Sequence, residues 1–306
     1  MDYAIRTEGL TKTYGPRAAV KDLSLEVPVG SVFGFLGPNG AGKTTTIRML
    51  LGLVRPTSGT ATVMGVDVSR QRSKLSSLVG AIVEVPAFYM HLSGAENLRA
   101  MALSAGRELP RAESDRLLEQ VGLSHDGKRA VKQYSLGMKQ RLGLAVALMG
   151  DPPVLFLDEP TNGLDPDGAR EIRELIVSLR QAGRTLFVSS HLLQEVERFC
   201  TDVAIVQNGE LRIQGPVETL LASRGIELRV SSMDRARAIL NLPAAQEAQG
   251  AGPGWVLTEG ADSAVPATLR KLLQADVDVF EVRPKRSSLE QLFFEATAAA
   301  QGGLRQ

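Results

Sequence analysis

A glycine-rich segment near the N-terminus reads Gly37-Pro38-Asn39-Gly40-Ala41-Gly42-Lys43-Thr44-Thr45. Its first part fits G-x-x-x-x-G-K-[ST], a pattern in which backbone N–H groups and a helix N-terminus surround an anionic phosphate. The apolar run Val32–Leu36 precedes the segment, and helix-like spacing follows it over Thr44–Leu53. We therefore expect Lys43 to reach the β- and γ-phosphates of a nucleotide and Thr44 to hold Mg²⁺. The alternative is a glycine-rich turn with a structural role.

Outward from this segment, short apolar runs alternate with helix-like spacing. The predicted strands are Val32–Leu36, Thr60–Met64, Val79–Val83, Val154–Leu157, Thr185–Ser189 and Val203–Gln207. The predicted helices are Thr44–Leu53, Ala95–Leu103, Ala112–Val121, Leu136–Met149 and Asp167–Arg180. Near-continuous apolar strands that alternate with helices predict a buried parallel sheet. Residues 86–150 are mostly helical and lie between two of these strands, so we expect a helical insertion there.

A second alternation begins near residue 223 and predicts a small α+β domain over residues 223–306. Its predicted elements are Ile226–Val230, Met233–Leu240, Trp255–Leu257, Ala264–Gln274, Val279–Arg283 and Ser288–Ala299. The stretch Ala244–Gly254 is rich in Gly, Ala and Pro, which predicts a loop. We expect two domains, residues 1–222 and 223–306, and nothing in the second one indicates catalysis.

Composition and charge exclude several classes of protein. The chain has 306 residues, of which 43% are hydrophobic and 23% charged, as is typical of a folded globular protein. Lys and Arg number 35 against 34 Asp and Glu, so no bulk positive charge favours nucleic-acid binding. The sequence contains no apolar run of 18 or more residues, so no membrane span is predicted, and the N-terminus lacks the pattern of an export signal. The single cysteine, Cys200, is expected to be a half-buried thiol on a helix.

Two acidic residues, Asp158 and Glu159, directly follow a fully apolar predicted strand. The carboxyl ends of parallel strands form the edge at which α/β proteins bind ligands. We expect Asp158 to coordinate Mg²⁺ through water, and Glu159 to orient or deprotonate the water that attacks the γ-phosphate. Acids at a strand end also serve as helix caps or solvated charges, but a phosphate loop in the same chain favours catalysis.

Four motifs, taken in their order along the chain, resemble the nucleotide-binding subunit of ABC transporters over residues 1 to about 222. They are the phosphate loop, Tyr134-Ser135-Leu136-Gly137-Met138-Lys139-Gln140-Arg141, Asp158-Glu159 and Ser189-Ser190-His191. More narrowly, Gly80-Ala81-Ile82-Val83-Glu84 and the Ser135–Arg141 string are similar to the branch of daunorubicin- and bacitracin-resistance exporters. The resemblance implies an α/β P-loop NTPase (RecA-like) core with an inserted helical subdomain, an N-terminal antiparallel β part and a small C-terminal α+β domain.

The resemblance further implies that ATP lies between two copies of the subunit, with the phosphate loop of one facing the signature tract of the other. Ser135 and Gly137 match that tract, whereas Leu136 replaces a glycine and Met138 stands, with the lysine after it, in place of a glutamine. Asp165 matches a loop that crosses the dimer interface. As alternatives, the tract simply starts a core helix, and Asp before Pro is an ordinary helix-start signal.

Other residues match the family one by one. Tyr14 matches the aromatic residue that stacks on adenine, with a core tyrosine as the alternative. His191 matches the histidine that senses the γ-phosphate, with an ordinary loop histidine as the alternative. Glu84 occupies the position of a glutamine that links the nucleotide site to the membrane partner; its carboxylate can offer Mg²⁺ an oxygen but lacks amide donors. The apolar residues 85–90 predict a docking surface for a transmembrane subunit or a locally buried loop.

These expectations combine into an ATPase subunit at the cytoplasmic face of the cell membrane. It binds and hydrolyses MgATP between two copies and powers export through a separate transmembrane permease. One alternative is a soluble ATPase of the same type that acts on ribosomes or DNA, although such chains carry two nucleotide domains, coiled coils or zinc motifs. Another is the ATPase of an importer. Residues 223–306 are expected to stabilise the dimer or to regulate it, and the sequence does not indicate the transported substrate.

Overall fold

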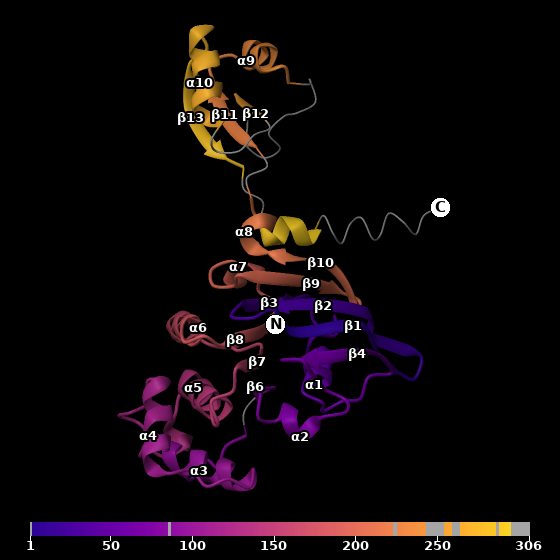
Figure 1. Ribbon diagram of the computed structural model, residues 1–306. Coiled ribbons are helices and arrows are strands. Elements are labelled where there is room, and N and C mark those ends of the chain that lie inside the picture. The colour runs from indigo at the N-terminus through magenta and orange to yellow at the C-terminus, as the bar shows by residue number, and fades with distance from the viewer. Residues whose placement is uncertain are drawn as a thin grey trace. The chain divides into compact units, whose positions relative to one another are not determined.

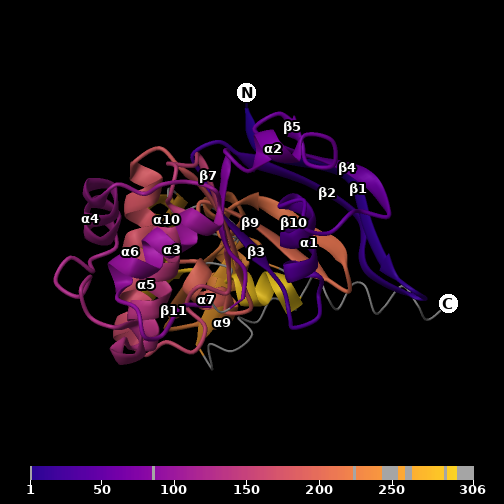
Figure 2. The same cartoon turned by 90° about the horizontal axis from the view of Figure 1, so that it is seen from below.

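The computed structural model describes residues 2–84, 87–222, 225–242, 254–258, 264–285 and 288–294. The chain divides into two compact units, Met1–Val217 and Glu218–Glu295. The sequence analysis places this boundary a few residues later, after residue 222. Figures 1 and 2 show the elements of each unit in two views.

The first unit is built around a six-stranded sheet in the order β10-β9-β3-β8-β7-β6. Its strands are β3 (Val32–Leu36), β6 (Val79–Ile82), β7 (Val154–Asp158), β8 (Thr185–Ser190), β9 (Asp202–Gln207) and β10 (Glu210–Pro216). Only β10 pairs in the antiparallel sense, and the other neighbouring strands are parallel. β3, β7 and β8 are buried along their whole length, as strands covered on both faces must be. This confirms the predicted parallel sheet.

A four-stranded antiparallel sheet, β2-β1-β4-β5, packs with the first. Its strands are β1 (Tyr3–Tyr14), β2 (Arg17–Pro28), β4 (Ser58–Val63) and β5 (Val66–Asp67). β4 is the run predicted at Thr60–Met64, so the expectation that this run joins the parallel sheet is wrong. Ala61 and Val63 are buried while Thr62 between them is partly exposed, because only one face of this strand is covered.

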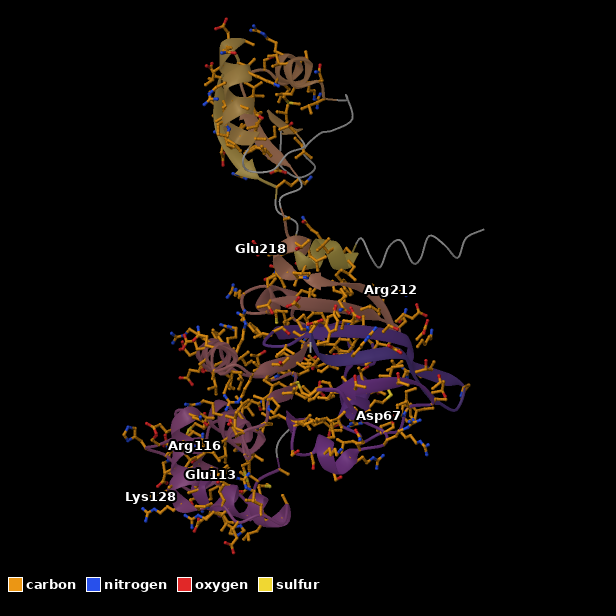
Figure 3. All side chains as sticks on the ribbon, viewed as in Figure 1. Asp67, Glu113, Arg116, Lys128, Arg212 and Glu218 are labelled. Carbon is orange, nitrogen blue, oxygen red and sulfur yellow. The ribbon has the colours of Figure 1, made fainter. Side chains whose placement is uncertain are left out.

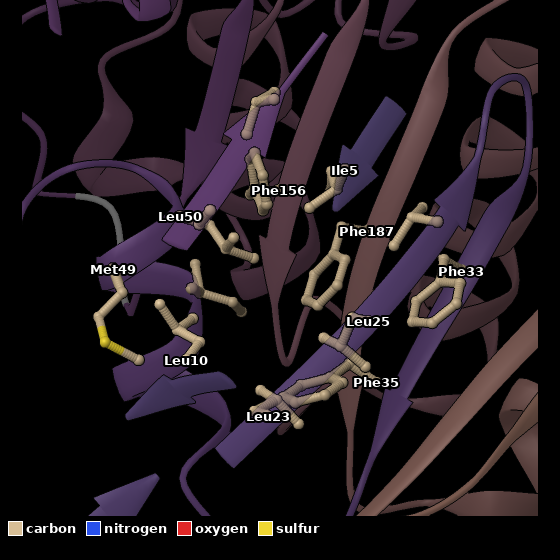
Figure 4. Close-up of a cluster of buried hydrophobic side chains, with 14 of the residues drawn as sticks. Ile5, Leu10, Leu23, Leu25, Phe33, Phe35, Met49, Leu50, Phe156 and Phe187 are labelled. Atoms are coloured by element: carbon tan, nitrogen blue, oxygen red, sulfur yellow. The ribbon is translucent and has the colours of Figure 1, made fainter. Parts of the chain in front are cut away.

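Four phenylalanines form the centre of the core between the two sheets. The ring of Phe187 on β8 lies 5.6 Å from Phe33, 5.2 Å from Phe35 and 5.5 Å from Phe156. Aliphatic side chains from the antiparallel sheet complete the cluster in Figure 4, among them Ile5, Leu10, Leu23 and Leu25. Each such buried side chain contributes about 1.5–3 kcal/mol. The cluster therefore fixes β3, β7 and β8 relative to one another, and with them the loops at their carboxyl ends.

The first unit also contains the helices α1 (Lys43–Leu50), α2 (Arg72–Leu75), α3 (Gly94–Ser104), α4 (Arg111–Gln120), α5 (Leu136–Ala147), α6 (Pro166–Gln181) and α7 (Leu193–Val196), with a 3-10 turn over Val131–Gln133. A short helix, α8 (Val217–Leu220), spans the boundary between the two units. α3, α4 and α5 pack on one another between β6 and β7. Figure 3 shows charged side chains such as Glu113 and Arg116 on this helical part.

α3 begins with reciprocal hydrogen bonds between Ser93 and Glu96. The Ser93 hydroxyl accepts from the Glu96 amide, and the Glu96 carboxylate accepts from the Ser93 amide. The Ser93 hydroxyl also donates to the Glu96 carboxylate, and this bond, together with the one from the Ser93 amide, holds the pKa of Glu96 below its ordinary value. The start of the helical part is therefore set by local sequence.

The second unit has a three-stranded antiparallel sheet in the order β12-β11-β13. Its elements are β11 (Ile226–Val230), α9 (Met233–Leu240), β12 (Trp255–Thr258), α10 (Val265–Gln274) and β13 (Val279–Pro284). Ile226, Leu228 and Val230 alternate toward a core shared with the helices. Residues 289–294 are helical and Ser288 directly precedes them, while residues 295–299 of the predicted helix Ser288–Ala299 and nearly all of the predicted loop Ala244–Gly254 lie outside the described residues.

Cys200, expected to be half-buried on a helix, is 8% exposed and follows α7. Burial raises the pKa of its thiol well above the ordinary value, which makes it a structural group. Within the described parts of the chain, no helix combines the length and the apolar character that crossing a membrane requires.

Candidate functional site

The phosphate loop joins the end of β3 to the N-terminus of α1. Gly40 and Gly42 adopt φ angles of 81° and 101°, which other residues rarely tolerate. A Cβ on Gly42 would also lie 2.4 Å from the carbonyl oxygen of Ala19, so the chain leaves no room for one. No side chain caps the N-terminus of α1, and its free N–H groups are therefore available to an anion.

A cavity of about 450 Å³ opens beside this loop. It is lined by Tyr14, Arg17, Ala19, Asn39, Gly40, Gly42, Lys43, Thr44, Thr45 and Glu159. The end of β1, the phosphate loop and the end of β7 thus meet at one opening. Its volume lies within the range of about 300–1,000 Å³ that is usual for small-molecule sites.

Lys43 is 7% exposed, and its ammonium group is surrounded by oxygen atoms. Nζ donates to the carbonyl oxygens of Gly37 at 2.7 Å and Pro38 at 3.3 Å. It also lies 3.2 Å from Oε1 of Glu159. Phosphate oxygens are acceptors of the same kind, so a bound phosphate can take over these contacts.

The two acids at the end of β7 face different partners. Asp158 accepts from the Thr44 hydroxyl at 2.8 Å through Oδ2 and from the Ser189 hydroxyl at 2.5 Å through Oδ1. Glu159 contacts Lys43 through one oxygen, and its Oε2 lies 2.8 Å from Nδ1 of His191. The structure therefore brings together the predicted loop residues, both predicted acids and the predicted histidine.

The donor set beside Thr44 suits a hard divalent cation. The Thr44 hydroxyl and the Asp158 carboxylate are oxygen ligands, the kind that Mg²⁺ prefers. Within the described residues, no cluster of three or more His, Cys, Asp or Glu side chains forms a metal site by itself. Mg²⁺ usually keeps several waters and binds through one or two protein oxygens plus substrate phosphates, so the two side chains fit it.

Tyr14 lies at the end of β1, lines the cavity and is 51% exposed. This exposure excludes the alternative of a core tyrosine. Nζ of Lys12 lies 5.1 Å from the centre of its ring, a cation–π contact. Arg17, the first residue of β2, lines the same cavity and was missed by the sequence analysis. A basic residue shortly after Tyr14 was the available signal.

The signature-like tract lies away from this cavity. Ser135 caps α5, because its hydroxyl accepts from the Met138 amide at 3.2 Å. Leu136 is 46% exposed, and none of Ser135, Leu136, Gly137 or Met138 lines the cavity. Both views show α5 and α1 well apart. The N-terminus of α5 therefore contributes nothing to the cavity of its own chain.

Asp165 and Glu84 also have local partners. Asp165 caps α6 by accepting from the Gly168 amide at 3.1 Å, with Pro following at the first helical position, which confirms the helix-start signal. The Glu84 carboxylate pairs with Arg48 of α1, a partner that the sequence analysis missed. The hydrogen bonds of the described residues do not join Glu84 to Thr44 or Asp158.

The fold and the site define a P-loop nucleoside-triphosphate hydrolase. A glycine loop joins a buried parallel strand to a helix N-terminus, and a lysine and a threonine there face two acids at the end of a nearby parallel strand.

Comparisons with known proteins narrow this class. The family described as ABC transporter matches residues 20–162. The bacitracin transport ATP-binding protein BcrA of Bacillus licheniformis is 45% identical over 78% of each chain. The uncharacterized ABC transporter ATP-binding protein YhcH of Bacillus subtilis is 40% identical over 97% of each chain. The solved structure of cbiO1 from Clostridium perfringens, part of an ABC transporter complex, matches with a TM-score of 0.63 at 28% identity, over 72% of this chain and 90% of that one.

The chain therefore belongs to the ATP-binding proteins of ABC transporters and is an ATP hydrolase of that family. This confirms the resemblance deduced from the order of the motifs, including the narrower likeness to the bacitracin-resistance branch.

Proposed function

We propose that two copies of this protein bind two MgATP between them, hydrolyse them and thereby drive export through a separate transmembrane permease. The observation that carries the proposal is the convergence of Lys43, Thr44, Asp158, Glu159 and His191 around the phosphate loop. Two adjacent carboxylates next to a lysine and a helix N-terminus are the parts that phosphoryl transfer to water requires.

ATP binding uses the whole length of the cavity. The phosphate loop and the N-terminus of α1 receive the phosphates, and the half-exposed ring of Tyr14 stacks on adenine. Lys43 exchanges its carbonyl and carboxylate contacts for the β- and γ-phosphate oxygens. Thr44 and Asp158 hold Mg²⁺, which when bound neutralises charge on those same oxygens.

Glu159 is the catalytic base. Its Oε1 contacts Lys43 in the structure, so the transfer of Lys43 to phosphate frees this oxygen to accept a proton from the attacking water. His191 contacts the other carboxylate oxygen through Nδ1, and its second ring nitrogen donates to the γ-phosphate as well when the ring carries both protons. Binding of the substrate therefore releases the base that the reaction needs.

The second half of each site comes from the second copy. The N-terminus of α5 has no role in its own cavity, yet its N–H groups and the Ser135 hydroxyl are suited to a γ-phosphate. Leu136 and Met138 replace family residues on either side of Gly137 and leave Ser135 and Gly137 in place. Asp165, in the loop before α6, lies at the same interface in this proposal.

The permease docks on a small apolar hollow beside β6. This hollow of about 250 Å³ is lined by Ala81, Ile82, Val83, Ala87, Phe88, Met101, Gly143 and Val146. Tyr89 and Met90, next along the chain, are 49% and 43% exposed. An apolar recess with exposed apolar neighbours suits a short helix of a membrane partner. The first two residues of the predicted docking strip, 85 and 86, lie outside the described residues.

Two residues of α3 offer a matched test of this surface. Met101 lines the hollow, while Leu103, two residues further on, is 64% exposed. We expect the tagged wild-type protein and Leu103→Glu to recover a polytopic membrane protein from detergent-solubilised membranes of the host, and Met101→Glu to lose it. ATP binding by all three should be equal in calorimetry. Recovery of ribosomal or DNA-associated proteins alone would favour the soluble alternative, and an associated solute-binding protein would favour an importer.

The direction of transport is proposed from the relatives. BcrA is described as a bacitracin transport protein, and the motif string of this chain belongs to that branch. ATP is available on the cytoplasmic side of the membrane. We therefore expect this ATPase, bound to its permease, to lie at the cytoplasmic face. For the second unit, Glu218–Glu295, we propose stabilisation or regulation of the dimer. Its deletion should then weaken ATP-driven dimerisation, measured by size-exclusion chromatography.

A further inference from the structure

Ser189 lies on β8 directly opposite Asp158 of β7 and is completely buried. Its hydroxyl donates to Oδ1 of Asp158 at 2.5 Å and accepts from the Glu159 amide at 3.0 Å. An ionised carboxylate can only accept a hydrogen bond, and a backbone N–H can only donate one. The hydroxyl therefore gives its single proton to Asp158 and accepts from Glu159 through its oxygen. One side chain therefore contacts both members of the acidic pair.

The backbone at Glu159 needs this support. Glu159 has a φ of 50°, in the left-handed region that side chains other than glycine rarely adopt. The turn directs Asp158 to Thr44 and Glu159 to Lys43 and His191. The Glu159 amide is bound by both the hydroxyl and, at 3.3 Å, the carbonyl oxygen of Ser189. Ser189 thus holds the turn at the Glu159 amide through two acceptors.

The two oxygens of Asp158 have separate tasks. Oδ2 accepts from Thr44, which lines the cavity, so this oxygen is directed to the place where a cation and phosphate bind. Oδ1 accepts from the buried Ser189 hydroxyl on the side of β8. Without that bond, the 7% exposed carboxylate would lose a donor and could rotate to satisfy Oδ1 elsewhere.

We propose that Ser189 is a positioning residue for both acids. Its hydroxyl orients Asp158 toward Thr44 and fixes the turn that aims Glu159, although it touches neither nucleotide nor water. This inference rests on the proposed function, in which Thr44 and Asp158 hold Mg²⁺.

Thr185 provides a matched control on the same strand. It is 1% exposed, and its hydroxyl accepts from the Gly30 amide at 2.9 Å at the opposite end of β8. Ser189→Ala and Thr185→Val each remove one buried hydroxyl and little else. Both should lower the unfolding temperature, but only Ser189 contacts the acidic pair.

The test measures binding, turnover and stability of the full chain. Calorimetry with a non-hydrolysable ATP analogue, in Mg²⁺ and in EDTA, gives the gain in affinity that Mg²⁺ confers. We expect Ser189→Ala to reduce this gain about 3- to 10-fold and turnover about 10- to 100-fold, with affinity in EDTA unchanged. Thr185→Val should keep both quantities within about twofold of the wild type. Equal effects of the two variants, confined to thermal unfolding, would overturn the proposal.

A second variant decides the matter if the alanine chain does not fold. Ser189→Cys retains a weaker S–H donor, so the Mg²⁺-dependent gain should fall several-fold. A cysteine variant with the wild-type gain and turnover would overturn the role of Ser189. Failure of the proposed function itself would be visible separately, as wild-type turnover that does not need Mg²⁺.

Discussion

The N-termini of α1 and α5 both suit an anion, yet their surroundings differ. At the start of α1, Lys43 and Thr44 contact two acids beside a cavity of about 450 Å³. At the start of α5, Ser135 bonds to the Met138 amide of its own helix, and Leu136 is 46% exposed. Among the described residues, the first helix end is part of a network and the second is not.

In the proposed dimer, one chain holds a preformed half of the site and displays the other half for a second copy. The preformed half draws side chains from α1 and from the ends of β1, β7 and β8, whereas the displayed half needs only a capped helix. Variants near α1 should therefore act on binding or chemistry within a chain. Variants at the start of α5 should act only when two chains meet.

The largest expected effect is that of Glu159→Gln. The amide keeps the shape of the side chain but cannot act as the base, so turnover should fall about 10²- to 10⁴-fold, as phosphate release would show. ATP binding should persist, and the variant should accumulate as an ATP-bound dimer. Glu174→Gln, on the exposed face of α6, is the matched control. Wild-type turnover in Glu159→Gln would refute the assignment of the base.

Lys43→Ala should weaken nucleotide binding itself. Charge-assisted bonds to phosphate contribute about 1.5–3 kcal/mol, so calorimetry should show about a 10- to 100-fold loss of affinity. Lys128→Ala removes an exposed lysine of the helical part and should leave affinity unchanged. Equal affinities of Lys43→Ala and the wild type would contradict the role of the loop.

Leu136→Asp tests the displayed half of the site. An acid in the first turn favours α5 itself, so the monomer should fold and bind ATP normally. In the dimer the carboxylate would face the partner's γ-phosphate, and ATP-driven dimerisation and turnover should fall about tenfold or more. Leu136→Ala adds no charge and serves as the control. A loss of ATP affinity in the isolated monomer would show that α5 acts within its own chain.

The smallest expected effect is that of Tyr14→Ala. Aromatic stacking contributes about 0.5–1.5 kcal/mol, so the KM for ATP should rise about 2- to 10-fold while kcat is kept. Tyr14→Phe preserves the ring and should resemble the wild type. If Tyr14→Phe and Tyr14→Ala raise the KM for ATP equally, the phenol hydroxyl and not ring stacking contributes to ATP binding.

Contiguous motifs made much of the site predictable. The loop residues, Glu159 and His191 follow parallel strands and Asp158 ends one, and the carboxyl ends of such strands meet at one edge. Long apolar runs also predicted β3, β7 and β8 to within a residue at each end. Local sequence was sufficient wherever a strand and the loop after it carried the information.

Pairing between distant segments was not predictable in the same way. Ser189 contacts Asp158 because the register of β7 and β8 places the two residues opposite each other. Arg48 forms an ion pair with Glu84, 36 residues further along the chain. β4 looks like the other apolar runs in sequence, but its partner β1 decides the sheet that it joins. Apolar runs did not predict β1 and β2, because polar residues occupy much of both strands.

Mixing two inactive chains tests the central claim most directly. Glu159→Gln and Leu136→Asp each disable both sites of their own homodimer. In a mixed dimer, both defects fall in one site and the other site is intact. The account predicts that mixing restores phosphate release, to about a quarter of the wild-type rate where the two chains assort at random, since each mixed dimer has one intact site. A mixture as inactive as its two components would contradict the claim that each site is shared between two copies.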